Sequence, residues 1–336
     1  MSLRNELRGG RQTASDWFDF MHQGAQTIHA AKPNALVLVS GLNYDTDFGF
    51  MRNVEFGTQW DTKLVFEFHW YAFSQSNSQD NWTKQPLYQS CGFYKQWFEE
   101  QAAFIYRNGT KPYPVILSEF GLDERGTDVG ANNYLTCLST IAAGDDLDWA
   151  VWALQGSYYI RSGEAGTEEF YGVLDNSWTA PRNPDVFKRF KLLQQTLQDP
   201  FTSIANHNVI FHPVTGACAV ANVQDSNVYQ QAYCNQKSGW EHTGDGAPIT
   251  LSGTASCLRA TGSGQAATLS NQCNDTMSKW SLLSGLRLHI GVKDADLCLE
   301  WGVVGNASIG LVTNKCNLES TGSESQWFQL LPANLK

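Results

Sequence analysis

The chain has 336 residues, of which 42% are hydrophobic and 17% charged, and its formal charge is −10. This is the composition of an ordinary globular protein that is long enough for two domains. The negative charge argues against nucleic acid and anionic membranes as partners, because both attract basic surfaces. No apolar run approaches the roughly 18 residues of a membrane span, so membrane insertion is not expected.

Residues 1 to about 200 alternate short apolar strands with amphipathic helices. The predicted strands are 1–7, 35–42, 63–71, 114–121 and 147–156, and the predicted helices are 15–31, 91–107, 131–143 and 183–198. The first helix begins behind a candidate cap at Ser15 and Asp16. Its apolar residues recur at three-to-four spacing: Trp17, Met21, Ala25 and Ile28. Apolar strands that alternate with helices predict a parallel sheet buried on both faces.

Two glutamates stand where predicted parallel strands end. Glu6 ends MSLRNEL and Glu119 ends PVILSEF. In parallel α/β barrels the active site lies at the C-terminal strand ends, where such carboxylates converge. Two carboxylates about 5 Å apart suit a retaining glycosidase, with one as acid/base and the other as nucleophile. Apolar flanks would help Glu6 to hold its proton near neutral pH, as a general acid must.

Other polar and aromatic residues lie close to the same strand ends. His69 and Tyr71 are two residues apart in FHWYAF, hence on one face of a strand. Tyr71 is expected to donate a hydrogen bond to Glu119, which would lower the pKa of that carboxyl. Trp152, near the end of the last strand, offers a ring that could stack on a sugar. A buried histidine or tryptophan is more often structural, so the interpretation depends on the whole set.

Taken in order, this set resembles the family-5 glycoside hydrolases, the cellulase and mannanase superfamily with a (β/α)₈ barrel. In that family Asn-Glu closes the fourth strand, His-x-Tyr the sixth, Glu the seventh and Trp the eighth. The matching residues here are Asn5-Glu6, His69-Trp70-Tyr71, Glu119 and Trp152. The resemblance implies that Glu6 is the acid/base and Glu119 the nucleophile. It also implies that Asn5 contacts the sugar 2-hydroxyl and that His69, Tyr71 and Trp152 line the site. Leu7 departs from the family, which usually has Pro after Asn-Glu.

Under this resemblance the first three strands of the barrel would precede Met1. An arginine and a histidine that the family supplies from those strands, and a signal peptide, would precede it too. Five strands cannot close an eight-stranded barrel. The expected fold is therefore α/β, a partial (β/α)₈ TIM barrel with strands 4–8, and the activity of this chain is left open.

Residues 206–336 have a different pattern, with a threefold repeat of about 40 residues. Cys218, Cys257 and Cys298 each have a second cysteine downstream, at Cys234, Cys273 and Cys316. Each unit then ends in a tryptophan: Trp240, Trp280 and Trp327. The repeat indicates one supersecondary unit used three times, each closed by its own disulfide, with the tryptophans in a shared core. The predicted bridges are 218–234, 257–273 and 298–316, whereas the state of Cys91 and Cys137 is not decidable from spacing.

This repeat resembles the ricin B-type β-trefoil lectins over about 130 residues. Their closing Gln-x-Trp motif has serine at the Gln position here: Ser238, Ser278 and Ser325. The family's sugar-binding Asp, two places after each first cysteine, is replaced by Val220, Arg259 and Glu300. The resemblance implies an all-β trefoil in which only Glu300, with Trp301 beside it, retains a carboxylate and an aromatic face for sugar. A trefoil kept as a spacer or stabiliser is the alternative.

Two functions follow from these patterns. The first is a glycoside hydrolase that cleaves a neutral β-linked polysaccharide, with a barrel domain over 1–200, a trefoil over 206–336, and no metal or other cofactor. The second is a non-catalytic carbohydrate-binding or structural protein with a decayed barrel. The cysteines and the sequons at Asn81, Asn108, Asn274 and Asn306 suit a secreted chain, which is expected to be a monomer.

Overall fold

A computed structural model of the chain describes residues 1–53, 56–57, 62–75, 78–107, 112–126, 128–198, 207–232, 234, 239–304, 308–319 and 322–334. The chain divides into two compact units. Unit 1 comprises 1–81, 91–131 and 147–182, and unit 2 comprises 82–90, 132–146 and 183–336. The predicted boundary near residue 200 stays a prediction.

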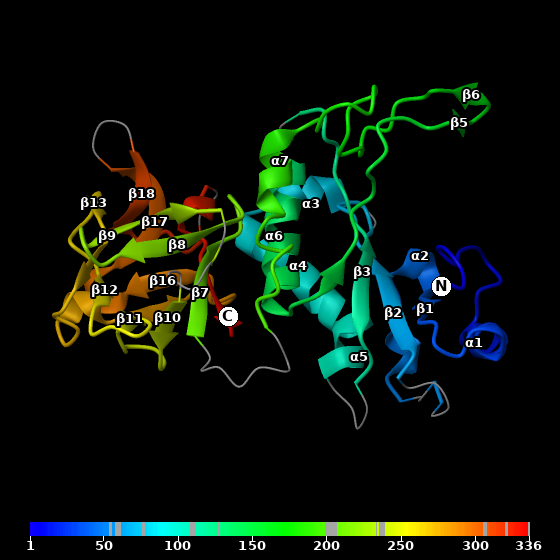
Figure 1. Ribbon diagram of the computed structural model, residues 1–336, viewed down its shortest axis with the longest axis horizontal. Coiled ribbons are helices and arrows are strands. Elements are labelled where there is room, and N and C mark those ends of the chain that lie inside the picture. Colours follow the sequence, from blue (N-terminus) through cyan, green and yellow to red (C-terminus); the bar gives the residue numbers. More distant parts are fainter. Residues whose placement is uncertain are drawn as a thin grey trace. The chain divides into compact units, whose positions relative to one another are not determined.

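A four-stranded parallel sheet forms the centre of unit 1. Its strands are β1 (Val37–Ser40), β2 (Leu64–His69), β3 (Val115–Glu119) and β4 (Asp148–Trp149), and they pair in chain order (Figure 1). Val37 lies opposite Leu64, and Phe66 opposite Val115. The first predicted strand is reduced to one parallel bridge between Ser2 and Leu38, and β4 has two residues instead of the ten expected. The parallel order agrees with the sequence pattern, whereas the strand lengths do not.

The two faces of this sheet differ in burial, contrary to the expectation that both are buried. Side chains that alternate along β1, β2 and β3 are almost fully buried, among them Val39, Phe66 and Leu117. The intervening Leu38, Val65 and Ile116 are partly exposed and line a groove of about 490 Å³. Only one face is fully covered because the aromatic side chains of unit 1 pack there. Phe68, for example, contacts Trp97 and Phe98 at ring-centroid distances of 5.3 and 5.2 Å.

Helix α1 (Ala14–Ala31) shows how local sequence produces the secondary structure of unit 1. Its cap is Thr13, whose hydroxyl accepts a hydrogen bond of 3.1 Å from the Asp16 amide, and not the predicted Ser15 or Asp16. Trp17, Met21 and Ala25 are buried as predicted. Three of the four predicted apolar positions therefore form the helix face that packs on the core.

The other helices range from three residues in η1 to sixteen in α6. They are α2 (Leu42–Asp45), η1 (Gly49–Met51), α3 (Ser78–Lys84), α4 (Leu87–Phe98), η3 (Glu99–Ala103), α5 (Phe104–Arg107), α6 (Val129–Gly144), α7 (Pro184–Arg189), η5 (Thr276–Ser278), η6 (Lys293–Ala295) and η7 (Glu324–Gln326). The predicted helix 183–198 is thus only six residues long. A small hairpin of β5 (Ile160–Arg161) and β6 (Glu164–Ala165) completes unit 1.

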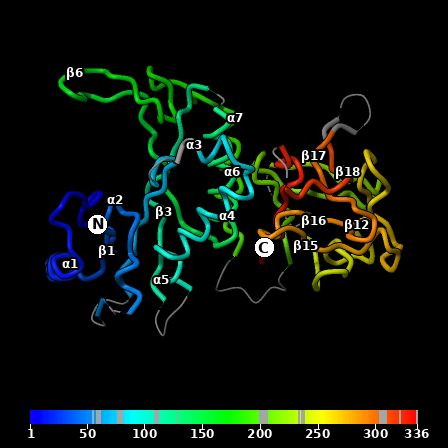
Figure 2. Tube along the Cα trace, turned by 180° about the vertical axis from the view of Figure 1, so that it is seen from behind, coloured from blue at the N-terminus to red at the C-terminus, as the bar shows by residue number. Residues whose placement is uncertain are grey.

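Unit 2 contains an antiparallel barrel and a second sheet. The barrel strands are β7 (His207–His212), β8 (Ala217–Asn222), β9 (Asn227–Gln231), β14 (Thr268–Ser270), β12 (Cys257–Arg259), β11 (Ile249–Leu251) and β10 (Gly239–His242). The barrel closes because β10 pairs with β7, and β19 (Gln329–Ala333) also pairs with β7 in antiparallel orientation. The second sheet has the order β13 (Gln265–Ala266), β18 (Ser308–Lys315), β17 (Leu297–Val304), β16 (His289–Val292) and β15 (Ser281–Leu283). Figure 2 shows β17 and β18 side by side.

Two of the repeat tryptophans make the same hydrogen bond in unit 2. The Trp240 indole donates to the Ala219 carbonyl at 3.0 Å, and the Trp280 indole donates to the Leu258 carbonyl at 2.8 Å. Each acceptor follows the first cysteine of its repeat. These two tryptophans and Trp327 have no exposed surface. Two of the three sequence repeats therefore share this local structure, whereas the Trp327 indole nitrogen has no such bond.

All eight cysteines are disulfide-bonded. The bridges Cys218–Cys234, Cys257–Cys273 and Cys298–Cys316 are present, with Cα–Cα distances of 5.8, 5.7 and 4.8 Å. These three predicted pairings are confirmed, and Cys91 and Cys137, which the sequence left undecided, are bonded as well. Within the described part of the chain, the helices are all too short or too polar to cross a bilayer.

Candidate active site

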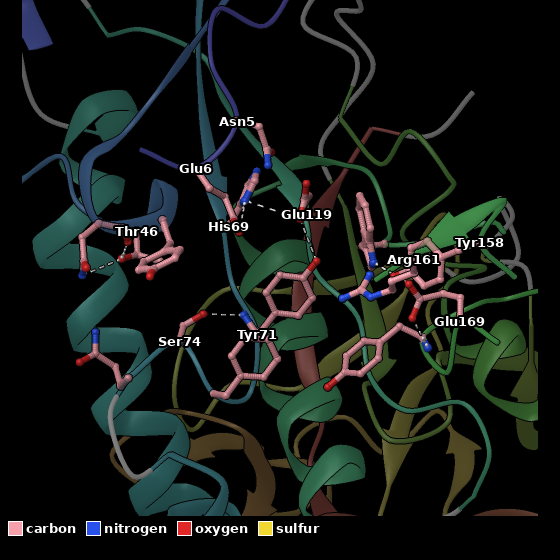
Figure 3. A pocket seen from close by; sticks show the side chains of 16 residues that line it. Asn5, Glu6, Thr46, His69, Tyr71, Ser74, Glu119, Tyr158, Arg161 and Glu169 are labelled. Atoms are coloured by element: carbon pink, nitrogen blue, oxygen red, sulfur yellow. Dashed lines mark hydrogen bonds and ion pairs between the residues drawn. The ribbon is translucent and has the colours of Figure 1, made fainter. Parts of the chain in front are cut away.

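A cleft of about 710 Å³ lies at the C-terminal ends of the parallel strands of unit 1 (Figure 3). Glu6 follows the segment that bridges to β1, Thr46 follows β1, and Tyr71 follows β2. Glu119 ends β3 and Trp152 follows β4. Parallel strands bring these ends to one edge of the sheet, which is why residues far apart in the sequence meet there.

The two glutamates face each other across His69. Nδ1 of His69 lies 3.2 Å from Oε1 of Glu6 and 3.6 Å from Oε2 of Glu119. One oxygen of each carboxylate and one ring nitrogen of His69 all lie within 4.8 Å of one another. The glutamate side chains are 21% and 18% exposed, and the histidine side chain is 3% exposed. The site thus holds two partly accessible carboxylates on either side of a buried imidazole.

Hydrogen bonds orient both carboxylates. The Tyr71 hydroxyl donates to Oε2 of Glu119 at 2.9 Å, as the sequence predicted. Arg8 donates to Oε2 of Glu6 at 3.0 Å. Burial nevertheless raises the pKa of Glu119, and His69 and Tyr71 oppose this effect only in part. The expectation that Tyr71 lowers the pKa is right for its own contribution and wrong for the net shift.

A fully buried carboxyl, Asp45, lies beneath this pair. Its Oδ2 accepts a hydrogen bond of 3.0 Å from the backbone amide of Glu6 and lies 3.5 Å from Nε2 of His69. Burial is the largest cause that raises its pKa, to about 8, and the charges of Glu67, Glu6 and Glu119 act in the same direction. The shift therefore favours the protonated form of this carboxyl near neutral pH.

The other side of the cleft is formed by Trp152 and the segment after it. Trp152 is 37% exposed, and its indole donates to Oε2 of Glu169 at 3.3 Å. The other oxygen of Glu169 accepts the Tyr171 amide at 3.0 Å. Arg161 lies over the Tyr158 ring at 4.3 Å from its centroid, and both residues line the cleft (Figure 3). An aromatic face and a cation thus border the cleft on the side of Trp152.

Six of the predicted site residues line this one cleft: Asn5, Glu6, His69, Tyr71, Glu119 and Trp152. Sequence reasoning missed Asp45, Glu169, Arg161 and Tyr158. Asp45 had a usable signal, since it follows a predicted parallel strand. Glu169 had none, because it lies in an irregular segment and reaches the cleft only through the fold.

The other two predicted residues, Glu300 and Trp301, lie on β17 in unit 2. Oε2 of Glu300 accepts hydrogen bonds from Gln326 at 2.8 Å and from Asn314 at 3.2 Å. Trp301 is only 8% exposed and packs against Phe328, with ring centroids 5.7 Å apart. The expected aromatic face for a sugar is therefore turned into the core, because successive side chains of a strand point to opposite faces. The Trp301 prediction is wrong in this respect.

A cation is the other species that this kind of cluster can hold. Among the described residues, Glu6, His69 and Glu119 are the group whose ligand atoms are close enough for one. In this structure Arg8 donates to Glu6 and Tyr71 donates to Glu119, and Nδ1 of His69 lies 3.2 Å from Glu6. A cation at this position would compete with these donors for the carboxylate oxygens.

Comparisons with known proteins indicate one family for the N-terminal half. Residues 1–157, which include every predicted catalytic residue, match the model of the cellulase family, glycosyl hydrolase family 5. A glycosyl hydrolase 5 family protein of Chamaecyparis obtusa is 33% identical over 358 aligned residues, which cover 99% of this chain and 62% of the relative. The chain thus spans less than two thirds of the length of this relative.

Solved structures show more distant similarity. A hyperthermophilic endocellulase of Pyrococcus horikoshii is 16% identical with a TM-score of 0.43, over 56% of this chain and 51% of that one. A β-glucanase of Saccharophagus degradans is 17% identical with a TM-score of 0.34, over 52% and 46% of the two chains. By its match to the family model over residues 1–157, this chain is similar to the cellulases of glycosyl hydrolase family 5.

Proposed function

We propose that this chain is a retaining glycoside hydrolase that cleaves a neutral β-linked polysaccharide of the glucan or mannan type. The observation that carries the proposal is the position of the Glu6 and Glu119 carboxylates, whose nearest site oxygens lie within 4.8 Å of each other. Retaining glycosidases place their two carboxyl groups about 5–5.5 Å apart, whereas inverting enzymes leave room for a water between them.

In this mechanism Glu119 attacks the anomeric carbon and Glu6 protonates the leaving oxygen. Water then hydrolyses the glycosyl-enzyme ester, with Glu6 acting as the base. The Tyr71 hydrogen bond supports an anionic Glu119. Asn5 contacts the sugar 2-hydroxyl at the rim, and Trp152 stacks on a sugar ring. The chemistry needs no cofactor, and the disulfides suit a secreted enzyme.

The test is hydrolysis of a panel of β-1,4-glucans and β-1,4-mannans by the wild type, Glu119→Gln and Glu6→Gln. A 2-deoxy-2-fluoro glycoside should add one glycosyl mass at Glu119 of the wild type and none in Glu119→Gln. Azide should restore turnover of an activated glycoside by Glu6→Ala, because azide needs no general base. Absence of both hydrolysis and the Glu119 adduct would refute the proposal. Loss of activity with EDTA would instead favour a metal site at Glu6, His69 and Glu119.

A second proposed function, sugar binding by a ricin B-type trefoil in unit 2, is favoured by the surroundings of Glu300. This partly exposed carboxylate is held by Asn314 and Gln326, and Gln326 is fixed in turn by its bond to the Lys315 carbonyl at 3.0 Å. Such an arrangement offers polar groups of fixed orientation that could form hydrogen bonds with the hydroxyl groups of a sugar. Retention of the Glu119→Gln variant on immobilised oligosaccharides, abolished by an added Glu300→Gln, would support it. Equal retention of both variants would leave unit 2 as a structural module.

A further inference from the structure

The loop after β1 has an unusual backbone. Three successive residues that carry a Cβ have left-handed conformations: Asn43, Tyr44 and Asp45, with φ of 52°, 61° and 59°. L-residues adopt this region rarely, and then mostly as single residues. Clusters of such conformations occur at active sites and ligand clamps, where the surrounding structure maintains them. Three consecutive left-handed residues therefore indicate that this loop has a functional role.

Backbone hydrogen bonds fix this loop. The Leu42 amide donates to the Asp47 carbonyl at 3.0 Å, and the Asp47 amide returns a bond of 3.1 Å to Leu42. The Tyr44 amide donates to the Leu7 carbonyl at 2.8 Å, which ties the loop to the segment that carries Glu6. The loop is thus closed and anchored without help from the Asp45 side chain.

That side chain points to the catalytic cluster. Asp45 has no exposed surface, and its Oδ2 accepts the Glu6 amide at 3.0 Å and lies 3.5 Å from Nε2 of His69. Glu6 itself has a φ of 47°, so its own left-handed conformation is fixed by the bond from its amide to Asp45. Asp45 therefore holds the backbone of one member of the cluster and faces the ring of another.

A purely structural role does not explain a carboxyl at this position. The acidic groups Glu6, Glu67 and Glu119 all lie near Asp45 and disfavour its negative charge. A buried carboxyl is costly unless its partners compensate for its loss of water. The contacts of Oδ2 go to Glu6 and His69, and not to the loop that Asp45 would otherwise stabilise.

We infer that Asp45 is a positioning residue that sets the backbone of the acid/base Glu6 and the orientation of the His69 ring between the two glutamates. This inference rests on the proposed glycosidase function. With Nε2 of His69 facing Asp45, Nδ1 lies within hydrogen-bond distance of Glu6, at 3.2 Å, and 3.6 Å from Glu119. Removal of Asp45 should therefore impair proton donation by Glu6 more than attack by Glu119.

Two aryl β-cellobiosides, and the corresponding mannobiosides, separate these effects. A 4-nitrophenyl leaving group needs more help from the acid than a 2,4-dinitrophenyl group, which leaves without protonation. We expect Asp45→Ala to lower kcat/KM about 10- to 100-fold for the poorer leaving group and less than about 3-fold for the better one. Asp45→Asn, which keeps an acceptor for the Glu6 amide and tolerates left-handed backbone, should recover part of the loss.

Asp47→Asn is the matched control, because it removes a neighbouring, partly exposed carboxyl that accepts a hydrogen bond of 2.8 Å from the nearby Gly49 amide. Equal losses on both substrates in Asp45→Ala, or the same pattern in Asp47→Asn, would overturn the inference. Unchanged kinetics in Asp45→Ala would overturn it as well.

A second readout does not need turnover. In ¹⁵N-histidine-labelled protein, with His69 assigned from His69→Gln, the ring-nitrogen shifts report which nitrogen carries the proton. We expect Asp45→Asn to move the His69 signals and Asp47→Asn to leave them in place. Unmoved His69 signals in Asp45→Asn would refute the positioning role. If the wild type hydrolyses no substrate but these signals move, the positioning holds and the proposed hydrolase function fails.

Discussion

The Tyr71 hydroxyl donates a 2.9 Å hydrogen bond to Oε2 of Glu119. Residue 71 follows β2 and residue 119 ends β3, so adjacent parallel strands bring the two side chains together. The bond opposes the effect of burial, which raises the pKa of Glu119. It therefore favours the charged form that a nucleophile needs.

Tyr71→Phe should raise the pKa of Glu119 further, because the variant loses a donor to the carboxylate. The acidic limb of the pH profile of kcat/KM should move to higher pH, with about a 10-fold loss of activity near that limb, which corresponds to roughly one pKa unit. The ¹³C shift of the Glu119 carboxyl provides the same measurement without substrate. Tyr159→Phe, at a position that is 90% exposed, is the control. An acidic limb at the same pH in Tyr71→Phe and in wild type would contradict the role assigned to Tyr71.

Asp45 should make the stability of unit 1 fall as pH rises. Its pKa is 3.8 when exposed and about 8 in the folded protein, so the folded state binds more protons between these values. Its contribution is fully present below pH 3.8 and is lost as pH rises to about 8. The loss has a limiting slope of about 1.4 kcal/mol per pH unit.

Asp45→Asn should remove the contribution of Asp45 to the pH dependence of the unfolding free energy. Urea unfolding at pH 5, 6, 7 and 8 would measure it, and the stability of the variant relative to wild type should increase with pH. A constant difference between the two proteins would contradict the raised pKa. Asp47→Asn again controls for the loss of one carboxyl.

Buried histidines should give unit 2 the opposite pH dependence. Burial lowers the pKa of His289 from 6.5 to about 4 and that of His212 to about 3. Between pH 6.5 and about 4 the unfolded His289 binds a proton and the folded residue does not, so stability is present above pH 6.5 and is lost as pH falls toward 4. His289→Gln should flatten the acid limb of the unfolding free energy of unit 2. His242→Gln, at a partly exposed site, controls for the loss of an imidazole. An equal acid slope in wild type and His289→Gln would refute this.

Glu169→Gln should weaken the hydrogen bonding that holds the Trp152 indole in place. The carboxylate of Glu169 accepts from the Trp152 indole and from the Tyr171 amide, but a glutamine has only one acceptor oxygen for two N–H donors. One donor is left facing an NH₂ group, at a cost of about 1–3 kcal/mol. We expect weaker oligosaccharide binding in a Glu119→Gln background, measured by Trp fluorescence titration. Glu168→Gln, at the neighbouring residue, should bind sugar like its parent; an unchanged affinity in Glu169→Gln would contradict the role of Glu169.

Local sequence determined the order of elements in unit 1. Apolar runs placed β1, β2 and β3 to within a few residues, because a central parallel strand must be apolar to be buried. Helical spacing identified the buried face of α1. Both signals depend on neighbours in the sequence, and both are visible without the fold. The lengths of the first and last strands were overestimated, because apolar character alone does not show where strand pairing stops.

The sequence by itself predicted which residues of unit 1 could catalyse a reaction, since carboxylate, imidazole and hydroxyl side chains stand at the strand ends of Asn5-Glu6, His69-Tyr71 and Glu119. Only the tertiary structure brought Asp45 into contact with Glu6, brought Glu169 into contact with Trp152, and buried the Trp301 ring. Hydrogen bonds between residues 39 and 17 positions apart, such as those of Asp45 and Glu169, depend on how irregular loops cross after folding. Burial of a single side chain depends on which face of its strand meets the core, and that is a property of the packed molecule.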